Sequence, residues 1–431
     1  MGKFEENAKP TKKTLLILGI AMLRAGTEKA FLSFARRLDF ERYDVTLLLA
    51  RAEGPLLSEI PPQIRVRELG KERFGDFFLL SGANAAKNMF DCFIRKNPLT
   101  AFEILPYFVR ILFSRGKKRQ DTATRMWVEM AKKHLPPVTL GEDGEPRFDN
   151  TGKEYDVCAA YWGDRTMFWM CDRAAAKKKL AWLHFDYFNP PREDELYLDY
   201  FRRCDAVVTV SGAIDAALKK ALPAVADRCV LMENLRDVDL LRKKMIEGDG
   251  FEDRCYTGKR ILSVGRICEQ KGFDMIIPVL RRFAREGREL RWYIIGGGSE
   301  EDVNALKGAA VENGVADRLM LLGEKENPYG YFRECDLYVQ PSRHEGKPIT
   351  VEEAKMLRCP ILVTNYLSAS DQLDGGRLGC ICDISPDGIY DGVRKMLDDE
   401  EMTGEFVRRL SEIDFSNEKE MDVFYRLAEA E

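Results

Sequence analysis

The sequence predicts an α/β protein made of two doubly wound domains, each with a parallel sheet between helices. Short apolar runs, suited to parallel strands that are buried on both faces, alternate with helical segments along the chain. Two series of such units follow one another with similar size and order, and 431 residues are enough for two domains with substantial cores. Two facing domains of this kind bind ligands in the cleft between them, at the carboxyl ends of their strands.

The first series is expected to form a domain over residues 1–215. A helix is predicted over about 28–38, a helical insertion over about 76–135 with a break near Asn97-Pro98, and a polar loop over 141–153. Apolar or alternating runs predict the strands of this domain at 14–18, 44–49, 64–69, 156–160, 179–183 and 206–210.

The second series predicts a domain over residues 216–405, followed by a helical segment over 406–431 that crosses back to the first domain. Its strands are expected at 229–232, 260–264, 292–295, 319–322, 336–340, 360–364 and 380–382. No close sequence repeat joins the two series, so their similarity is one of architecture.

The bulk composition argues against several classes of function. The net charge of −4 gives no general attraction to nucleic acid. No apolar run reaches the roughly eighteen residues of a membrane span, and residues 1–13 lack the apolar stretch of a signal peptide, so a cytoplasmic protein is predicted. The eleven cysteines form no CxxC pair and the three histidines are dispersed, which predicts free thiols and no metal site.

The most informative segment is 344–354, in which Glu345 and Glu353 stand eight residues apart between two apolar strands. Pro348 suits the first position of a helix, because that position needs no N–H. Amides at the start of such a helix can bind a diphosphate, and a carboxylate at each end suits hydroxyls on both sides of it. The segment therefore predicts a nucleotide-sugar site. The amides concerned belong to Gly346, Lys347 and Ile349.

Two cations precede this segment in the same predicted domain. Gly265-Arg266 follows one strand, and Lys271 comes five residues later, just before a helix. An arginine fork and a lysine point charge can converge on one anion, although two solvated surface cations around a turn would look the same. The remaining candidates in this domain are Gly297, Asn327 and Tyr329, which lie in loops. Such loops could allow the backbone to approach a ligand closely or could support a nucleotide base, and ordinary turns are the alternative interpretation.

The first predicted domain contributes three candidates. Gly26 opens the first helix, where its amide could approach a phosphate or sugar, although a lone glycine loop is weak evidence. His184 follows the strand at 179–183 and is expected to face the cleft, whereas a lone histidine is often structural. Asp186 could orient that histidine or bind a hydroxyl of an acceptor.

The segment 102–133 combines an aromatic, apolar half with a run of lysines and arginines. Such a segment can lie on an anionic membrane surface. An ordinary helix pair that covers the sheet with a charged outer face is the alternative interpretation.

These motifs together resemble glycosyltransferase family 4, whose members are retaining, metal-independent, nucleotide-sugar-dependent enzymes of the GT-B fold. The resemblance covers nearly the whole chain and favours the bacterial members that build surface polysaccharides. The segments that carry it in the second domain are 263–266, 271–273, 322–323, 327–329 and the Glu-x7-Glu motif 345–353, and those in the first domain are 26–28, 155–157, 181–184 and 208–211.

For the donor half, the resemblance implies that Arg266 and Lys271 bind the donor diphosphate and stabilise the leaving group. It implies that Glu353 accepts hydrogen bonds from the ribose hydroxyls and that Glu345 lies beside the donor sugar. In the first domain it implies a position near the diphosphate for Gly26.

The resemblance also places His184 beside the anomeric carbon. The chain is therefore predicted to be a cytoplasmic hexosyltransferase that retains configuration and needs no cofactor or metal. It would move a hexose from a nucleotide sugar, most simply a UDP-sugar, to a glycan or lipid-linked glycan in cell-surface polysaccharide synthesis. Peripheral contact of residues 102–133 with the inner face of the membrane stays one of the two interpretations of that segment. A nucleotide-sugar epimerase of the same fold and an inactive partner subunit remain alternatives.

Overall fold

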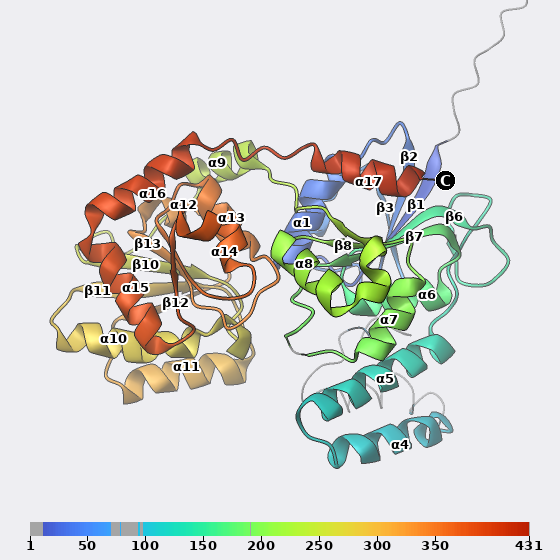
Figure 1. Cartoon of the computed structure of the whole chain (residues 1–431), viewed down its shortest axis with the longest axis horizontal. Coiled ribbons are helices and arrows are strands. Elements are labelled where there is room, and N and C mark those ends of the chain that lie inside the picture. The colour runs from blue at the N-terminus through green and yellow to red at the C-terminus, as the bar shows by residue number, and fades with distance from the viewer. Residues whose placement is uncertain (1–11, 70–77, 79–93, 95–97, 190, 431) are drawn as a thin grey trace, which may run out of the picture. The chain divides into compact units, whose positions relative to one another are not determined.

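The computed structural model describes residues 12–69, 78, 94, 98–189 and 191–430 (Figure 1). The chain divides into two compact units. The first comprises residues 1–210, 215–235 and 418–431, and the second comprises 211–214 and 236–417. Each unit is a parallel sheet with helices packed against it.

The first unit contains a seven-stranded parallel sheet in the order β3-β2-β1-β6-β7-β8-β9. The central strands carry almost no exposed side chains, as expected for a sheet covered on both faces. The strands are β1 (Lys13–Gly19), β2 (Tyr43–Leu49), β3 (Arg65–Glu68), β6 (Tyr155–Ala160), β7 (Ala176–Leu183), β8 (Ala206–Thr209) and β9 (Cys229–Leu231).

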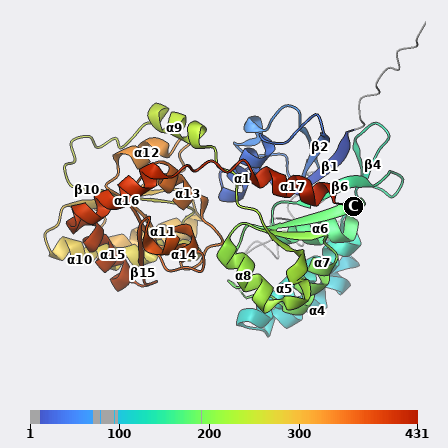
Figure 2. The same ribbon diagram turned by 45° about the horizontal axis from the view of Figure 1, so that its top comes forward.

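Helix α1 lies on one side of this sheet, and helices α4 to α6 lie on its other side. The bounds of the helices are α1 (Gly26–Ala35), α4 (Thr100–Leu112), α5 (Gly116–His134), α6 (Asp164–Arg173), α7 (Asp194–Arg202) and α8 (Gly212–Ala221). The first three residues of α8 are grouped with the second unit. Helices α4 and α5 lie side by side in both views (Figures 1 and 2). They form the described part of the predicted insertion, whereas its first part lies mostly outside the described residues.

Two expectations for the first unit are wrong in detail. The polar loop at 141–153 includes part of a short antiparallel hairpin, formed by β4 (Thr139–Leu140) and β5 (Pro146–Arg147). Strand β9, which was expected to open the second series, pairs with β8 instead, with Val207 opposite Cys229. A strand of three residues carries too little pattern to indicate which strand it pairs with. Its position after α8 in the chain brings β9 to the edge of the first sheet. The first unit therefore continues to Leu235, beyond the boundary predicted after residue 215.

The second unit contains a six-stranded parallel sheet in the order β12-β11-β10-β13-β14-β15, and all six strands were predicted. Alternate residues of one strand enter two different cores: Ile261 packs with α10, α11 and α15, whereas Leu262 packs with α12 and α13. The strands are β10 (Lys259–Val264), β11 (Leu290–Ile295), β12 (Leu319–Gly323), β13 (Leu337–Gln340), β14 (Ile361–Thr364) and β15 (Cys380–Cys382). The helices are α9 (Val238–Glu247), α10 (Ile276–Arg285), α11 (Glu300–Glu312), α12 (Tyr329–Glu334), α13 (Ile349–Met356), α14 (Ala369–Gln372), α15 (Pro386–Asp398) and α16 (Glu400–Glu412).

The predicted segment 406–431 is divided between the units. Helix α16 ends within the second unit, and α17 (Glu420–Glu429) belongs to the first. Phe424 of α17 makes an edge contact with Phe34 of α1, with ring centroids 5.0 Å apart. Glu429 accepts a hydrogen bond of 2.9 Å from the hydroxyl of Tyr43 on β2. The end of the chain thus completes the core of the first unit.

Candidate functional site

The loop between β13 and α13 forms the centre of the candidate site. Pro348 has φ −64° and ψ 119°, so it is the last extended residue, and α13 begins at Ile349. The prediction that Pro348 occupies the first helical position is therefore wrong by one residue. Its carbonyl accepts the amide of Val351 at 3.2 Å, as a residue that precedes a helix should. The first-turn amides of α13 have no preceding helical carbonyl, so this end keeps its attraction for an anion.

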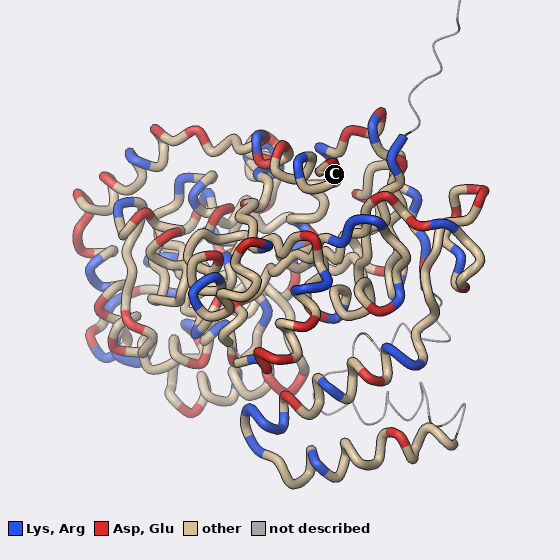
Figure 3. Tube along the Cα trace, turned by 45° about the vertical axis from the view of Figure 1, so that its right-hand side comes forward, with Lys and Arg blue, Asp and Glu red and all other residues tan. Residues whose placement is uncertain are grey.

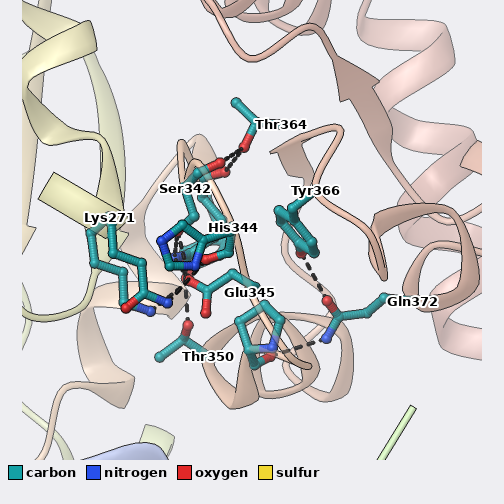
Figure 4. A network of polar contacts seen from close by, with 12 residues as sticks. Lys271, Ser342, His344, Glu345, Thr350, Thr364, Tyr366 and Gln372 are labelled. Atoms are coloured by element: carbon teal, nitrogen blue, oxygen red, sulfur yellow. Dashed lines mark hydrogen bonds and ion pairs between the residues drawn. The ribbon is translucent and has the colours of Figure 1, made fainter. Parts of the chain in front are cut away.

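Glu345 is held at the start of this loop by three donors that reach the same oxygen. Its Oε1 accepts hydrogen bonds from Lys271 Nζ at 2.7 Å, Ser342 Oγ at 2.6 Å and Gln340 Nε2 at 3.2 Å (Figure 4). The side chain is 6% exposed. In the described part of the chain no hydrogen bond reaches Oε2. One oxygen is therefore fixed by the protein and the other is available to a ligand.

Gln340 and Ser342 are themselves oriented by neighbours, and the sequence analysis missed both. The Oε1 atom of Gln340 accepts from the hydroxyls of Tyr338 at 2.5 Å and Thr350 at 3.2 Å, which leaves its amide to donate to Ser342 and Glu345. Both residues are almost completely buried. Two polar side chains at the carboxyl end of an apolar strand were the signal that could have found them. The network positions Glu345 rather than contacting a ligand itself.

The loop that carries Lys271 lies against the loop that carries Glu345. Gly272 adopts φ +69°, and a Cβ at this position would lie 2.1 Å from the carbonyl oxygen of Pro341. Only glycine permits this approach. Gly265 lies beneath the aliphatic stem of Lys271, because a Cβ on Gly265 would lie 3.3 Å from Lys271 Cε. Close packing of the two loops thus brings Lys271 to Glu345.

Arg266 differs from Lys271 in its surroundings. Its side chain is exposed and makes no hydrogen bond or ion pair within the described residues. The predicted pair of cations is therefore present, with one member neutralised by Glu345 and the other directed to solvent. An exposed guanidinium with no internal partner remains available to an anion.

The predicted loop candidates have roles within the fold. A Cβ on Gly296 would lie 2.0 Å from the carbonyl oxygen of Gly265, and the carbonyl of Gly297 accepts the amide of Ile267 at 2.6 Å, so the glycine run joins the ends of β10 and β11. Asn327 donates to the carbonyl of Lys244 at 2.6 Å and accepts the amide of Tyr329 at 3.1 Å. Both polar groups of Asn327 are thus used internally, which disfavours its predicted contact with the donor.

Tyr329 connects this loop to the second glutamate of the motif. Its hydroxyl donates to Glu353 Oε1 at 2.7 Å, and Glu353 is 2% exposed. Glu353 is therefore held in place by the residue that was expected to bind the donor directly. The structure thus shows that Tyr329 orients Glu353, and its direct contact with a donor stays a prediction.

A buried charged cluster, which the sequence patterns did not indicate, surrounds Glu352 of α13. Glu352 contacts Lys355 Nζ at 3.1 Å and Arg236 Nε at 3.3 Å, and accepts from Gln372 Nε2 at 2.9 Å. Burial alone would raise the pKa of Glu352, but Lys355, Lys347 and Arg236 outweigh it and lower that pKa to about 2. Lys347, predicted to offer only its amide, thus adds a buried positive charge next to the first turn of α13.

The first unit holds the other three predicted residues. Gly26 begins α1 after the extended Ala25, as expected. His184 follows β7, and its ring lies 4.7 Å from the ring of Tyr161. Its Nε2 is buried with no hydrogen-bond partner within the described residues, and burial lowers the pKa of His184 to about 3, so the ring is neutral at pH 7.

Asp186 does not match its predicted role as an acceptor ligand. Its Oδ1 accepts the amide of Phe188 at 2.8 Å, and its Oδ2 accepts Asn189 Nδ2 at 2.9 Å. The side chain is 2% exposed. Both carboxylate oxygens thus stabilise the loop after β7. An aspartate that precedes a turn readily accepts a hydrogen bond from the amide two residues later.

The described residues contain no group of three or more His, Cys, Asp or Glu side chains placed to hold a metal ion.

Comparison with known proteins finds a family match for most of the second unit. Residues 255–412 match the family model of the group 1 glycosyl transferases. This part of the chain is therefore similar to the group 1 glycosyl transferases. The Glu345 network, Arg266 and α13 all lie within it. The matched region begins just before β10 and ends with α16, so it covers the complete sheet of the second unit.

Curated relatives are similar over about two fifths of the chain. N-acetylgalactosamine-N,N'-diacetylbacillosaminyl-diphospho-undecaprenol 4-alpha-N-acetylgalactosaminyltransferase of Campylobacter jejuni is 27% identical over 177 residues, which is 41% of this chain and 46% of the relative. Lipopolysaccharide core biosynthesis mannosyltransferase LpcC of Rhizobium leguminosarum is 26% identical over 184 residues, which is 42% of this chain and 50% of the relative. The matches thus span about half the length of these relatives.

Solved structures are similar over almost the whole chain. Anabaena Alr3699/HepE in complex with UDP and glucose has a TM-score of 0.65 at 14% identity and covers 96% of this chain and 99% of its own. A glycosyltransferase from Rickettsia africae has a TM-score of 0.62 at 14% identity and covers 97% and 100%. The predicted GT-B class, with two Rossmann-like domains, is confirmed.

Proposed function

We propose that the protein is a retaining glycosyltransferase that moves a hexose from a nucleotide sugar, a UDP-sugar in the first instance, to a glycan or lipid-linked glycan. The observation that carries the proposal is the three-donor clamp on Glu345 Oε1, next to the start of α13 and within the residues that match the group 1 glycosyl transferases. The relatives named for lipid-linked and lipopolysaccharide glycans support this class of acceptor.

The reaction breaks the bond between the anomeric carbon and the diphosphate, whose oxygen takes the electron pair. A new bond forms from the anomeric carbon to an acceptor oxygen, and the acceptor proton passes to a phosphate oxygen of the leaving group. Arg266 and the amides at the start of α13 would stabilise the developing negative charge, which removes the need for a metal ion or cofactor. Glu345 Oε2 would face the sugar, where positive charge builds as the first bond breaks.

Lys271 would act in two states. Without donor it neutralises Glu345, at 2.7 Å. A diphosphate offers a second anionic partner, and Ser342 and Gln340 would keep Glu345 in place while Lys271 turned toward it. Glu345 could thus keep its buried position whether or not Lys271 contacts it.

Donor hydrolysis and transfer across UDP-, GDP- and ADP-sugars, with and without lipid-linked acceptors, test the proposal. We expect acceptor-dependent release of UDP, retained configuration in the product by NMR, and activity that survives EDTA. Arg266→Ala should lower kcat on the order of 10²-fold, by analogy with loss of a preorganised donor. Arg285→Ala, which removes an exposed arginine of α10, serves as the control.

The outcomes separate the alternatives. Interconversion of two UDP-sugars without any acceptor would identify an epimerase. Absence of turnover with every donor would leave an inactive subunit. Loss of activity in EDTA with rescue by Mn²⁺ would refute the metal-independent mechanism.

A further inference from the structure

Helix α4 carries two apolar faces, and only one of them is covered. Ile104 is buried, and Tyr107, Phe108 and Ile111 pack against the core of the first unit. The opposite face carries large side chains with exposed fractions of 75% at Phe102, 58% at Leu105, 44% at Val109, 77% at Leu112 and 88% at Phe113. Spacings of three or four residues place Phe102, Leu105, Val109 and Leu112 along one stripe of the helix, and Phe113 directly follows its last residue.

No comparable stripe occurs elsewhere in the described parts of the chain. Apart from Leu99, which immediately precedes α4, the other exposed large hydrophobic residues are spread over separate elements, as at Ile246 of α9 and Val311 of α11. Single exposed residues need no explanation, whereas a contiguous apolar surface marks a binding site. We call the stripe formed by Phe102, Leu105, Val109, Leu112 and Phe113 the α4 outer face.

Basic side chains gather at one end of the α4 outer face. Figure 3 shows Lys and Arg concentrated at the turn from α4 to α5. These side chains are exposed and form no ion pair within the described residues, whereas Arg125 further along α5 pairs with Glu193, and Lys133 near its end pairs with Glu103. The five unpaired cations, called here the basic turn, are Arg110, Arg115, Lys117, Lys118 and Arg119.

We propose that the α4 outer face and the basic turn dock this protein on an anionic lipid bilayer, with α4 lying in the interface. An apolar stripe enters the boundary between headgroups and acyl chains, and flanking cations bind anionic headgroups while their stems stay in apolar surroundings. No helix in the described part of the chain is long and apolar enough to cross a membrane.

A second copy of the chain fits this surface less well. A two-fold contact with the two α4 helices parallel would bring both basic turns together, where like charges repel. An antiparallel contact would separate the basic turns but would set each against the apolar stripe of the other copy, which offers no carboxylate. An anionic bilayer instead satisfies both parts of the surface at once. The docking is separate from the transfer reaction, because it uses none of the residues assigned to donor binding.

Co-sedimentation with vesicles, measured without donor or acceptor, tests the proposal. The whole protein is mixed with vesicles of phosphatidylcholine alone or with about a third phosphatidylglycerol. One variant changes the basic turn to serine, and a second changes Phe102, Leu105, Leu112 and Phe113 to serine. A control variant carries Ile246→Ser and Val311→Ser, and circular dichroism and thermal unfolding verify that each variant folds.

We expect the wild type and the control to bind the anionic vesicles and to dissociate as salt rises. Each cation near the surface contributes about fivefold to the partition coefficient, which corresponds to about 1 kcal/mol. The basic-turn variant loses five such cations, so it should bind on the order of 10³-fold more weakly. The apolar variant should lose binding to a similar extent.

Equal binding of the folded wild type and either variant would overturn the proposal. So would absence of wild-type binding to anionic vesicles. Sedimentation velocity adds a further check: conversion of a wild-type dimer to a monomer by the apolar variant, without vesicle binding by the wild type, would identify the α4 outer face as a self-association surface. A protein that binds vesicles but transfers no sugar would refute the proposed function and leave this inference standing.

Discussion

Substitution of Ser342 by alanine should test whether the clamp on Glu345 serves catalysis. Ser342 Oγ donates to Glu345 Oε1 at 2.6 Å and accepts from Gln340 Nε2 at 2.8 Å. A hydrogen bond to a charged group contributes roughly 1.5–3 kcal/mol. Lys271 and Gln340 still reach the same oxygen at 2.7 and 3.2 Å, so we expect the lower value. That loss corresponds to about a tenfold reduction in kcat.

The assay compares kcat and KM for transfer with UDP affinity measured by calorimetry. UDP affinity should change little, because Ser342 acts through a carboxylate that faces the sugar. Ser368→Ala is a matched control: this serine is equally buried, and its Oγ has no hydrogen-bond partner within the described residues. Wild-type kcat in Ser342→Ala, or an equal loss in Ser368→Ala, would refute the positioning role.

Three further predictions concern the surroundings of the site. Gly272→Ala should destabilise the protein by well over 1 kcal/mol in denaturant unfolding, because its Cβ would meet a backbone oxygen at 2.1 Å, whereas Gly287→Ala, at φ +70° in open space, should cost only about 1 kcal/mol. The pKa of Glu352 is about 2 in the native protein, against 4.5 ordinarily, so its ionised form stabilises the fold above pH 4.5, and this stabilisation is lost as the pH falls toward 2. The stability advantage of the wild type over Glu352→Gln should therefore shrink by about 3 kcal/mol across that window, measured by unfolding at several pH values. A difference that stays constant with pH would contradict the assignment. Tyr329→Phe removes a hydrogen bond of 2.7 Å to Glu353 and should raise the donor KM several-fold with little change in kcat; an unchanged KM would argue against ribose recognition by Glu353.

The chain-local features of this protein follow from its sequence. Strands such as β10 and β13 were predictable because a short apolar run between polar loops suits only a buried parallel strand. The start of α13 was predictable to within one residue, because a proline ends an extended segment and permits a helix to follow. The identity of Arg266, Lys271, Glu345 and Glu353 as candidates also came from spacing alone.

The tertiary structure decided which of these groups meet and which are occupied. Lys271 and Glu345 are 74 positions apart in sequence, and their contact depends on two loops that pack closely at Gly272. Asn327 and Asp186 carry polar groups suited to a ligand, yet both use them inside the fold. Sequence patterns report which chemical groups are present and the local backbone they favour. Hydrogen-bond partners depend on long-range packing, since a buried polar group binds whichever complementary group the fold brings within reach.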